Sequence, residues 1–143
     1  MGVVLAEVRD APVAAAELLD LVARPDAGAV ALFVGMVRDH DPQASGTVVS
    51  LDYTCHPSAP TRIGEIVTDA LAVADPDGRC TVAAVHRVGH LEVGETAFVV
   101  AVSSPHRALA FAVCEHLVER VKAELPVWKQ QFESDGSYRW SGL

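Results

Sequence analysis

The stretch between Cys80 and Ser103 reads CTVAAVHRV, then GHLEVGE, then TAFVVAVS. Residues 80–88 and 96–103 are two valine-rich runs, and the polar residues between them contain two glycines. Such apolar runs around a glycine-containing spacer are typical of two antiparallel strands. We therefore predict a hairpin with a long loop at residues 89–95, and the other elements follow outward from it.

A helix and two more strands are expected after this hairpin. Ser104 can cap the helix, and Pro105 is tolerated at its first position. Pro126 must end it, because the residue before a proline is pushed out of the α region. The expected elements are a helix from 104 to about 124 and strands at 127–132 and 138–140. The apolar stripe of the helix is expected to comprise Phe111, Cys114, Val118, Val121 and Leu125.

Strands and helices also alternate before the hairpin. Asp10 can cap the first helix, with Pro12 in its first turn. The near-continuous apolar run at 29–37 predicts a strand that is buried on both faces. Residues 38–46 are polar and contain a proline and a glycine, so we expect a mobile loop there. The expected elements are strands at 3–8, 29–37 and 47–53 and helices at 11–23 and 59–74.

The predicted order of elements is β-α-β-β-α-β-β-α-β-β over 143 residues. Helices that alternate with pairs of strands indicate an α+β fold with a mostly antiparallel sheet. No repeat or long linker interrupts the chain, so we expect a single domain over residues 1–143.

The charge balance excludes some classes of partner. The chain has 11 Lys and Arg against 19 Asp and Glu, which gives a net charge of −8. General binding to nucleic acids or anionic membranes is therefore not expected, and any anion site must be a local basic pocket. The wide spacing of the three cysteines excludes a zinc ribbon and suits a reducing compartment. The N-terminus has no signal-peptide pattern, so we expect a cytoplasmic protein.

The chain contains only two lysines, Lys122 and Lys129. Most single lysines are solvated surface charges, and that interpretation remains open for both. Lys129, however, is predicted to share a strand face with Val127 and Gln131, while Trp128 points the other way. Partial burial and a nearby second cation would lower the pKa of a lysine toward the range useful for acid–base catalysis.

Two other segments could hold an anion. Ser104-Pro105-His106-Arg107 opens a predicted helix, where free N–H groups and the helix dipole favour negative charge. Arg38 leaves a predicted strand and enters a polar loop. Each segment is equally compatible with ordinary surface residues. The sequence has no P-loop, no G-x-S-x-G and no H-E-x-x-H motif.

Several blocks of the sequence, in order and spacing, match one known family. They are residues 28–38, Val-His-Arg-Val-Gly at 85–89, Ser-Ser-Pro-His-Arg-Ala at 103–108 with Phe111, Lys-x3-Pro-x-Trp-Lys at 122–129, and Gly136 with Trp140. In these blocks the chain resembles the large catalytic subunit of molybdopterin synthase, from about residue 3 to residue 140.

The resemblance implies an α/β hammerhead fold and a homodimer. Each large subunit would bind one small ubiquitin-like sulfur carrier, which gives a heterotetramer. The carrier's C-terminal Gly-Gly thiocarboxylate would deliver two sulfurs in succession to cyclic pyranopterin monophosphate, producing the dithiolene of molybdopterin. No metal or organic cofactor is implied for this step.

The resemblance also implies a set of functional residues. Lys122 and Lys129 would be the essential catalytic pair, and Arg38, His106 and Arg107 would hold the phosphate and polar edges of the pterin. The full substrate-binding set is Met36, Val37, Arg38, His106, Arg107, Lys122, Lys129, Gln130 and Gln131.

The sequence departs from the family pattern in two places. Gln131 stands where some members have Glu, and residues 53–59 replace a more usual aromatic-Pro-x-Met stretch. Two other functions remain open: a non-catalytic binding module for a phosphorylated small molecule or peptide tail, and a purely structural homodimer.

Overall fold

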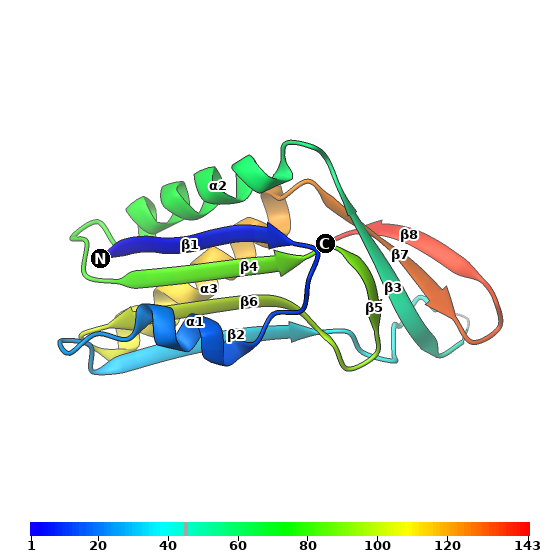
Figure 1. The fold of residues 1–143 in the computed structure, drawn as a ribbon, viewed down its shortest axis with the longest axis horizontal. Helices are drawn as coiled ribbons and strands as arrows, with labels where there is room; N and C mark the ends of the chain where they lie inside the picture. The colour runs from blue at the N-terminus through cyan, green and yellow to red at the C-terminus, as the bar shows by residue number, and fades with distance from the viewer. Residues whose placement is uncertain (45) are drawn as a thin grey trace.

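The computed structural model describes residues 1–44 and 46–143, which form three helices and eight strands in two four-stranded sheets (Figure 1). The predicted α+β class is confirmed, and all but one strand pairing is antiparallel. In this part of the chain, no helix combines the length and the apolar character needed to cross a bilayer.

The first sheet contains the predicted hairpin at its centre. Its strands, in spatial order, are β1 (Gly2–Arg9), β4 (Thr81–Arg87), β6 (Thr96–Ser104) and β2 (Ala29–Met36). Strands β4 and β6 pair antiparallel, with Thr81 opposite Ser103 and His86 opposite Phe98. Strand β1 runs parallel to β4, so the hairpin is enclosed on both sides.

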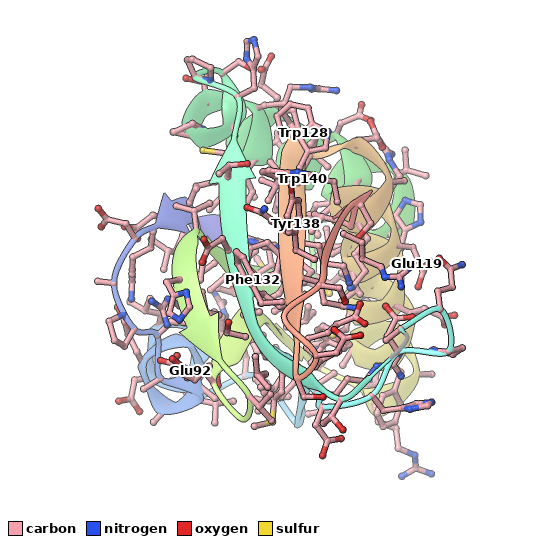
Figure 2. All side chains as sticks on the ribbon, turned by 90° about the vertical axis from the view of Figure 1, so that its right-hand side faces the viewer. Glu92, Glu119, Trp128, Phe132, Tyr138 and Trp140 are labelled. Atoms are coloured by element: carbon pink, nitrogen blue, oxygen red, sulfur yellow. The ribbon has the colours of Figure 1, made fainter. Side chains whose placement is uncertain are left out.

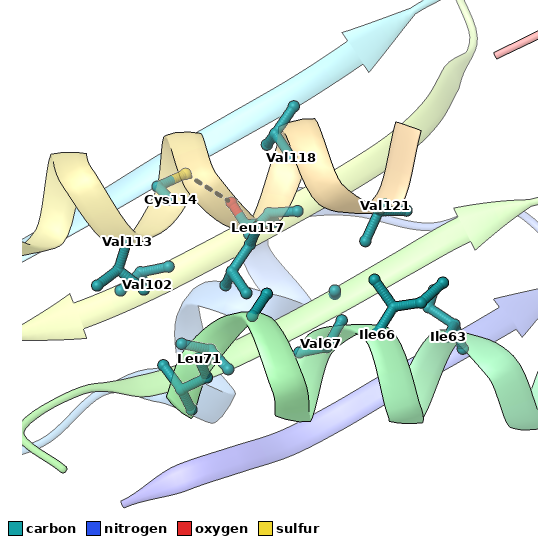
Figure 3. Packing of buried hydrophobic residues seen from close by; sticks show 14 of the residues in the cluster. Ile63, Ile66, Val67, Leu71, Val102, Val113, Cys114, Leu117, Val118 and Val121 are labelled. Atoms are coloured by element: carbon teal, nitrogen blue, oxygen red, sulfur yellow. Dashed lines mark hydrogen bonds between the residues drawn. The ribbon is translucent and has the colours of Figure 1, made fainter. Parts of the chain in front are cut away.

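Helices cover both faces of this sheet. Helices α2 (Ala59–Ala74) and α3 (Arg107–Glu124) pack together on one face, and α1 (Ala15–Val22) packs on the other (Figure 1). Figure 3 shows side chains of α2 and α3 meeting in the larger core, where Ile63, Ile66 and Leu117 are fully buried. Burial of each such side chain contributes about 1.5–3 kcal/mol. This packing makes α3 a rigid support for the residues at its two ends.

The second sheet lies at one end of the first (Figure 1). Its strands, in spatial order, are β5 (Gly89–Glu92), β3 (Val48–Cys55), β7 (Val127–Glu133) and β8 (Tyr138–Gly142). Strand β5 corrects the prediction of a loop at 89–95. Gly89 has a φ of +98°, which glycine adopts easily, and the chain then pairs with β3 and buries Leu91.

The starts of two helices were predicted too early. Helix α1 begins at Ala15 without a side-chain cap, so Asp10 does not cap it. Ser104 is the last residue of β6, where it pairs with Ala29, and α3 begins only at Arg107. The Ser104 hydroxyl still accepts the His106 N–H, at 3.4 Å. At Ser104, sheet pairing thus held the chain extended where a local capping signal predicted a helix.

Strand β2 and the side chain of Phe111 are more exposed than the sequence predicted. Burial of β2 on both faces is wrong, because it is an edge strand with Val30 47% and Leu32 41% exposed. Phe111, predicted in the apolar stripe of α3, is 68% exposed. The loop expected at 38–46 falls between β2 and β3 and includes Ser45, which lies outside the described residues.

Candidate active site

A polar cavity of about 210 Å³ lies between the second sheet, the end of α3 and the segment after β2. It brings together both lysines of the chain, which the sequence separates by a proline break. The lining residues are Met36, Val37, Arg38, His40, Asp41, Leu51, Tyr53, Lys122, Lys129 and Gln131.

The sheet supplies one wall of the cavity through strand register. Lys129 on β7 lies opposite Tyr53 on β3, and Gln131 lies opposite Leu51. Because side chains alternate along a strand, these four residues share the inner face. Trp128 is 45% exposed on the outer face, where Figure 2 shows it with Phe132, Tyr138 and Trp140. The predicted orientation of Lys129 is therefore confirmed.

The other walls come from fixed ends of regular elements. Lys122 stands in the last turn of α3, just before Pro126 breaks the helix. Val37 is anchored after β2 by two backbone bonds: its N–H donates to Glu95 at 3.0 Å, and its carbonyl accepts from Gly94 at 2.8 Å. This anchor directs Arg38 into the cavity lining.

The cavity is electropositive although the protein is acidic. Arg38, Lys122 and Lys129 face a single lining carboxylate, Asp41. Within the described ranges 1–44 and 46–143, no ion pair involves any of the three cations. Burial lowers the pKa of Lys129, and the charges of Lys122 and Arg38 lower it further, while Asp41 raises it. Lys129 is half-buried, whereas Arg38 and Lys122 are exposed, and such a group of cations without ion pairs favours binding of an anion.

A buried histidine lies behind the cavity. His86 on β4 is 2% exposed, and its ring meets the Tyr53 ring edge-on at 5.2 Å between centroids. Burial lowers its pKa to about 4, and the charge of Lys122 contributes to the shift. The Arg87 carbonyl, 2.7 Å from Nδ1, can only accept, so Nδ1 carries the proton. His86 is therefore neutral at pH 7 and adds no charge to the site.

Three predicted site residues lie away from this cavity. Gln130 alternates with Lys129 and points to the outer face of β7. His106 and Arg107 are exposed at the start of α3, whereas Lys122 is near its end. The rise of an α-helix places Arg107 and Lys122 about 22 Å apart along the axis. One chain therefore does not bring the two ends of α3 to the same cavity.

Sequence reasoning missed four lining residues, which are His40, Asp41, Leu51 and Tyr53. It also missed His86, which lies behind Tyr53 and does not line the cavity. The position of Tyr53 depends on the pairing of β3 with β7, which no local pattern reveals. Asp41 lies in the polar segment at 38–46, for which the sequence predicts a loop and no particular side-chain position. The sequence offered one signal for the missed lining residues: His40 and Asp41 follow Arg38 closely, and Tyr53 ends the strand predicted at 47–53.

A second, apolar cavity of about 340 Å³ lies between β2 and α3. Its lining includes Leu32, Phe33, Phe111 and Val118. Together with the exposed edge of β2, it forms an uncovered apolar surface on the side of the molecule that carries α3. Such surfaces on edge strands mark sites of protein association.

Comparisons with known proteins converge on one family. Residues 8–124 match the family described as MoaE protein. The chain is 37% identical over 133 residues to molybdopterin synthase catalytic subunit 1 of Mycobacterium tuberculosis, and the match covers 93% of this chain and 87% of that protein.

Solved structures agree with the sequence match. The crystal structure of molybdopterin synthase from Staphylococcus aureus superposes with a TM-score of 0.83 at 26% identity, covering 96% of this chain and 97% of that one. A Helicobacter pylori chain, solved as a complex of subunits 1 and 2 of molybdopterin-converting factor, has a TM-score of 0.71 at 19% identity, covering 94% and 88%. At that identity the second likeness shows the fold alone.

Proposed function

This chain belongs to the MoaE protein family, and from that premise we propose that it is the catalytic subunit of a molybdopterin synthase. It transfers two sulfurs from the Gly-Gly thiocarboxylate of a small carrier protein to cyclic pyranopterin monophosphate. The observation that carries the proposal is the convergence of Lys122, Lys129 and Arg38 on one cavity.

The charges of the cavity fit both reactants. The pterin precursor carries a phosphate, and the carrier tail ends in a thiocarboxylate, so each brings negative charge to a site with three cations. Each transfer forms a carbon–sulfur bond on the pterin side chain in place of a carbon–oxygen bond there. It breaks the acyl carbon–sulfur bond of the carrier, whose acyl carbon takes an oxygen from water and leaves as a carboxylate. Ammonium groups beside the acyl carbon would stabilise the oxyanion that develops there.

The two lysines are suited to act as a pair. The lowered pKa of Lys129 brings its proton exchange closer to neutral pH. Lys122, on a different element, supplies a second positive charge at the same cavity. The pair can therefore combine proton transfer with charge stabilisation, two demands that a single ammonium group meets poorly.

The carrier is the expected protein partner. The H. pylori relative was solved as a complex of the two subunits of its converting factor, and this chain has the same fold. A carrier tail that ends in Gly-Gly is narrow enough to enter a cavity of about 210 Å³. The cytoplasmic location expected from the sequence stays a prediction.

A second copy of this chain is the proposed source of His106 and Arg107. These residues lie too far along α3 to reach the cavity of their own chain. The exposed apolar residues of β2 and Phe111 give a second copy a surface on which to pack. A homodimer would then place the start of one α3 near the lysine cavity of the other chain.

The test is a reconstituted reaction. The purified chain is mixed with the precursor and with carrier in its thiocarboxylate form, and dithiolene product is measured. Carrier with an ordinary carboxylate terminus is the control and should give none. Precursor binding without product in both reactions would favour the alternative, a non-catalytic binding module.

A further inference from the structure

Asp41 is the one lining residue of the lysine cavity whose side chain is a carboxylate. It follows Arg38 in the segment after β2, and the Gln43 N–H donates to its Oδ1 at 2.8 Å. The Ala44 N–H also donates to the Asp41 carbonyl at 2.9 Å. These local bonds fix both the backbone and the carboxylate, so Asp41 is positioned before any ligand binds.

Gln131 provides an independent observation at the same place. Its side chain is 4% exposed on the inner face of β7, and its Nε2 has no hydrogen-bond partner among the described residues. The Gln43 N–H lowers the pKa of the Asp41 carboxyl group most, and the nearby Gln131 amide lowers it further, although the geometry between Gln131 Nε2 and Asp41 is not that of a hydrogen bond. A buried donor without a partner costs about 1–3 kcal/mol, which a bound acceptor would offset.

Lys129 lines the same cavity as these two groups and as the cations Arg38 and Lys122. Arg38 and His40 line the cavity from the segment after β2, Lys122 from α3, and Tyr53 from β3. The neutral His86 lies behind Tyr53. Asp41 thus offers the only opposite charge among these lining groups, and its attraction opposes the repulsion from the neighbouring cations.

We propose that Asp41 is a positioning residue for sulfur transfer: its carboxylate, fixed by Gln43, orients the Lys129 ammonium beside the Gln131 amide so that both face an anion bound in the cavity. The proposal rests on the proposed function for its role in catalysis. Its structural part, the coupling of Asp41 to Lys129, can be measured without substrate.

The chain is favourable for this measurement because it has only two lysines. When the lysines are labelled with ¹³C at Cε, NMR spectra of the protein contain two lysine side-chain signals. The signal that disappears in the Lys122→Arg variant belongs to Lys122, and the other belongs to Lys129. In Asp41→Asn, we expect the pKa of Lys129 to fall by about 0.5–1 unit because the opposing charge is lost. The matched control is Asp39→Asn, a neighbouring exposed aspartate that does not line the cavity, and it should leave the titration unchanged.

An unchanged Lys129 titration in a folded Asp41→Asn protein would overturn the proposal, and so would an equal shift in Asp39→Asn. The Lys122 signal reports whether the cavity stays folded. In the sulfur-transfer assay, Asp41→Asn should lower kcat about tenfold and move its pH profile with the new Lys129 titration, and Asp41→Glu should restore part of the rate. Absence of activity in the unmodified protein would contradict the proposed function alone, since the titration needs no turnover.

Discussion

The two ends of α3 differ in what surrounds them. At its carboxyl end, Lys122 lines a polar cavity together with Lys129 and Arg38. At its amino end, His106 and Arg107 are exposed and line neither the lysine cavity nor the apolar cavity between β2 and α3. The family resemblance assigns both ends to one site. Under the proposed function, a single chain holds the lysine half of the site and a second copy of the chain supplies the rest.

The largest expected effect is at the carboxyl end. Lys129→Ala removes the partly buried ammonium, and we expect the rate of sulfur transfer to fall by about 100-fold or more. Gln130→Ala is the matched control, because its side chain lies on the opposite face of β7, and it should stay within about twofold of the unmodified protein. A normal rate in a folded Lys129→Ala protein would remove the lysine pair from the mechanism.

A smaller effect is expected at the amino end. Arg107→Ala should raise the KM for the pterin precursor by about 10-fold to 100-fold, the value of a hydrogen bond to a charged group. The folded chain itself should be unaffected, since the side chain is exposed. Steady-state kinetics check this, and an unchanged KM would mean that the amino end takes no part in binding.

Low pH should lower the folding stability of the chain, because it protonates the buried His86 behind the cavity at the carboxyl end of α3. Its folded pKa of about 4 lies below the ordinary value of 6.5, so between these pH values the unfolded chain binds the proton more strongly. Stability is therefore lost as the pH falls from 6.5 toward 4, by about 3 kcal/mol at most. Denaturant unfolding at several pH values measures this loss, and His86→Gln should show a shallower dependence. Equal slopes for the two proteins would contradict this explanation.

A substitution at Gly28 should affect only the amino end of α3. A Cβ at this position would lie 2.6 Å from the Pro105 carbonyl oxygen, just before His106. Gly28→Ala should cost about 1–3 kcal/mol of unfolding free energy, because the backbone must shift. Gly64→Ala in α2 has no atom within 4 Å and should stabilise the chain by about 0.5–1 kcal/mol. Thermal unfolding compares the two, and equal changes would mean that the contact with Pro105 is unimportant.

Local signals in the sequence predicted the elements that depend on local chemistry. Helix α2 has the expected bounds, and Pro126 ends the region of α3 as predicted. The hairpin of β4 and β6 follows from its two valine-rich runs. The start of α3 and the whole of β5 were missed because pairing with distant strands decides them. The start of α1 was also missed, and no strand pairing explains it.

The sequence likewise identified only part of the candidate site. Lys122, Lys129, Arg38 and Gln131 were identified from lysine usage and the family resemblance, and they do line one cavity. Asp41 and Tyr53 were not identified, because their places depend on a segment between sheets and on strand register. The distance between the two ends of α3 follows from helix geometry, but only once the start and end of the helix are known.

Complementation between two impaired variants, assayed at a precursor concentration below the KM of the unmodified protein, tests the shared site most directly. Lys129→Ala and Arg107→Ala chains are mixed in equal amounts, allowed to exchange subunits, and assayed for sulfur transfer. If each site combines the lysine cavity of one chain with the amino end of α3 from another, random pairing leaves about a quarter of the sites intact, and activity should recover to about a quarter of that of the unmodified protein. Activity that stays at the level of the separate variants, despite demonstrated exchange, would show that both residues act within one chain.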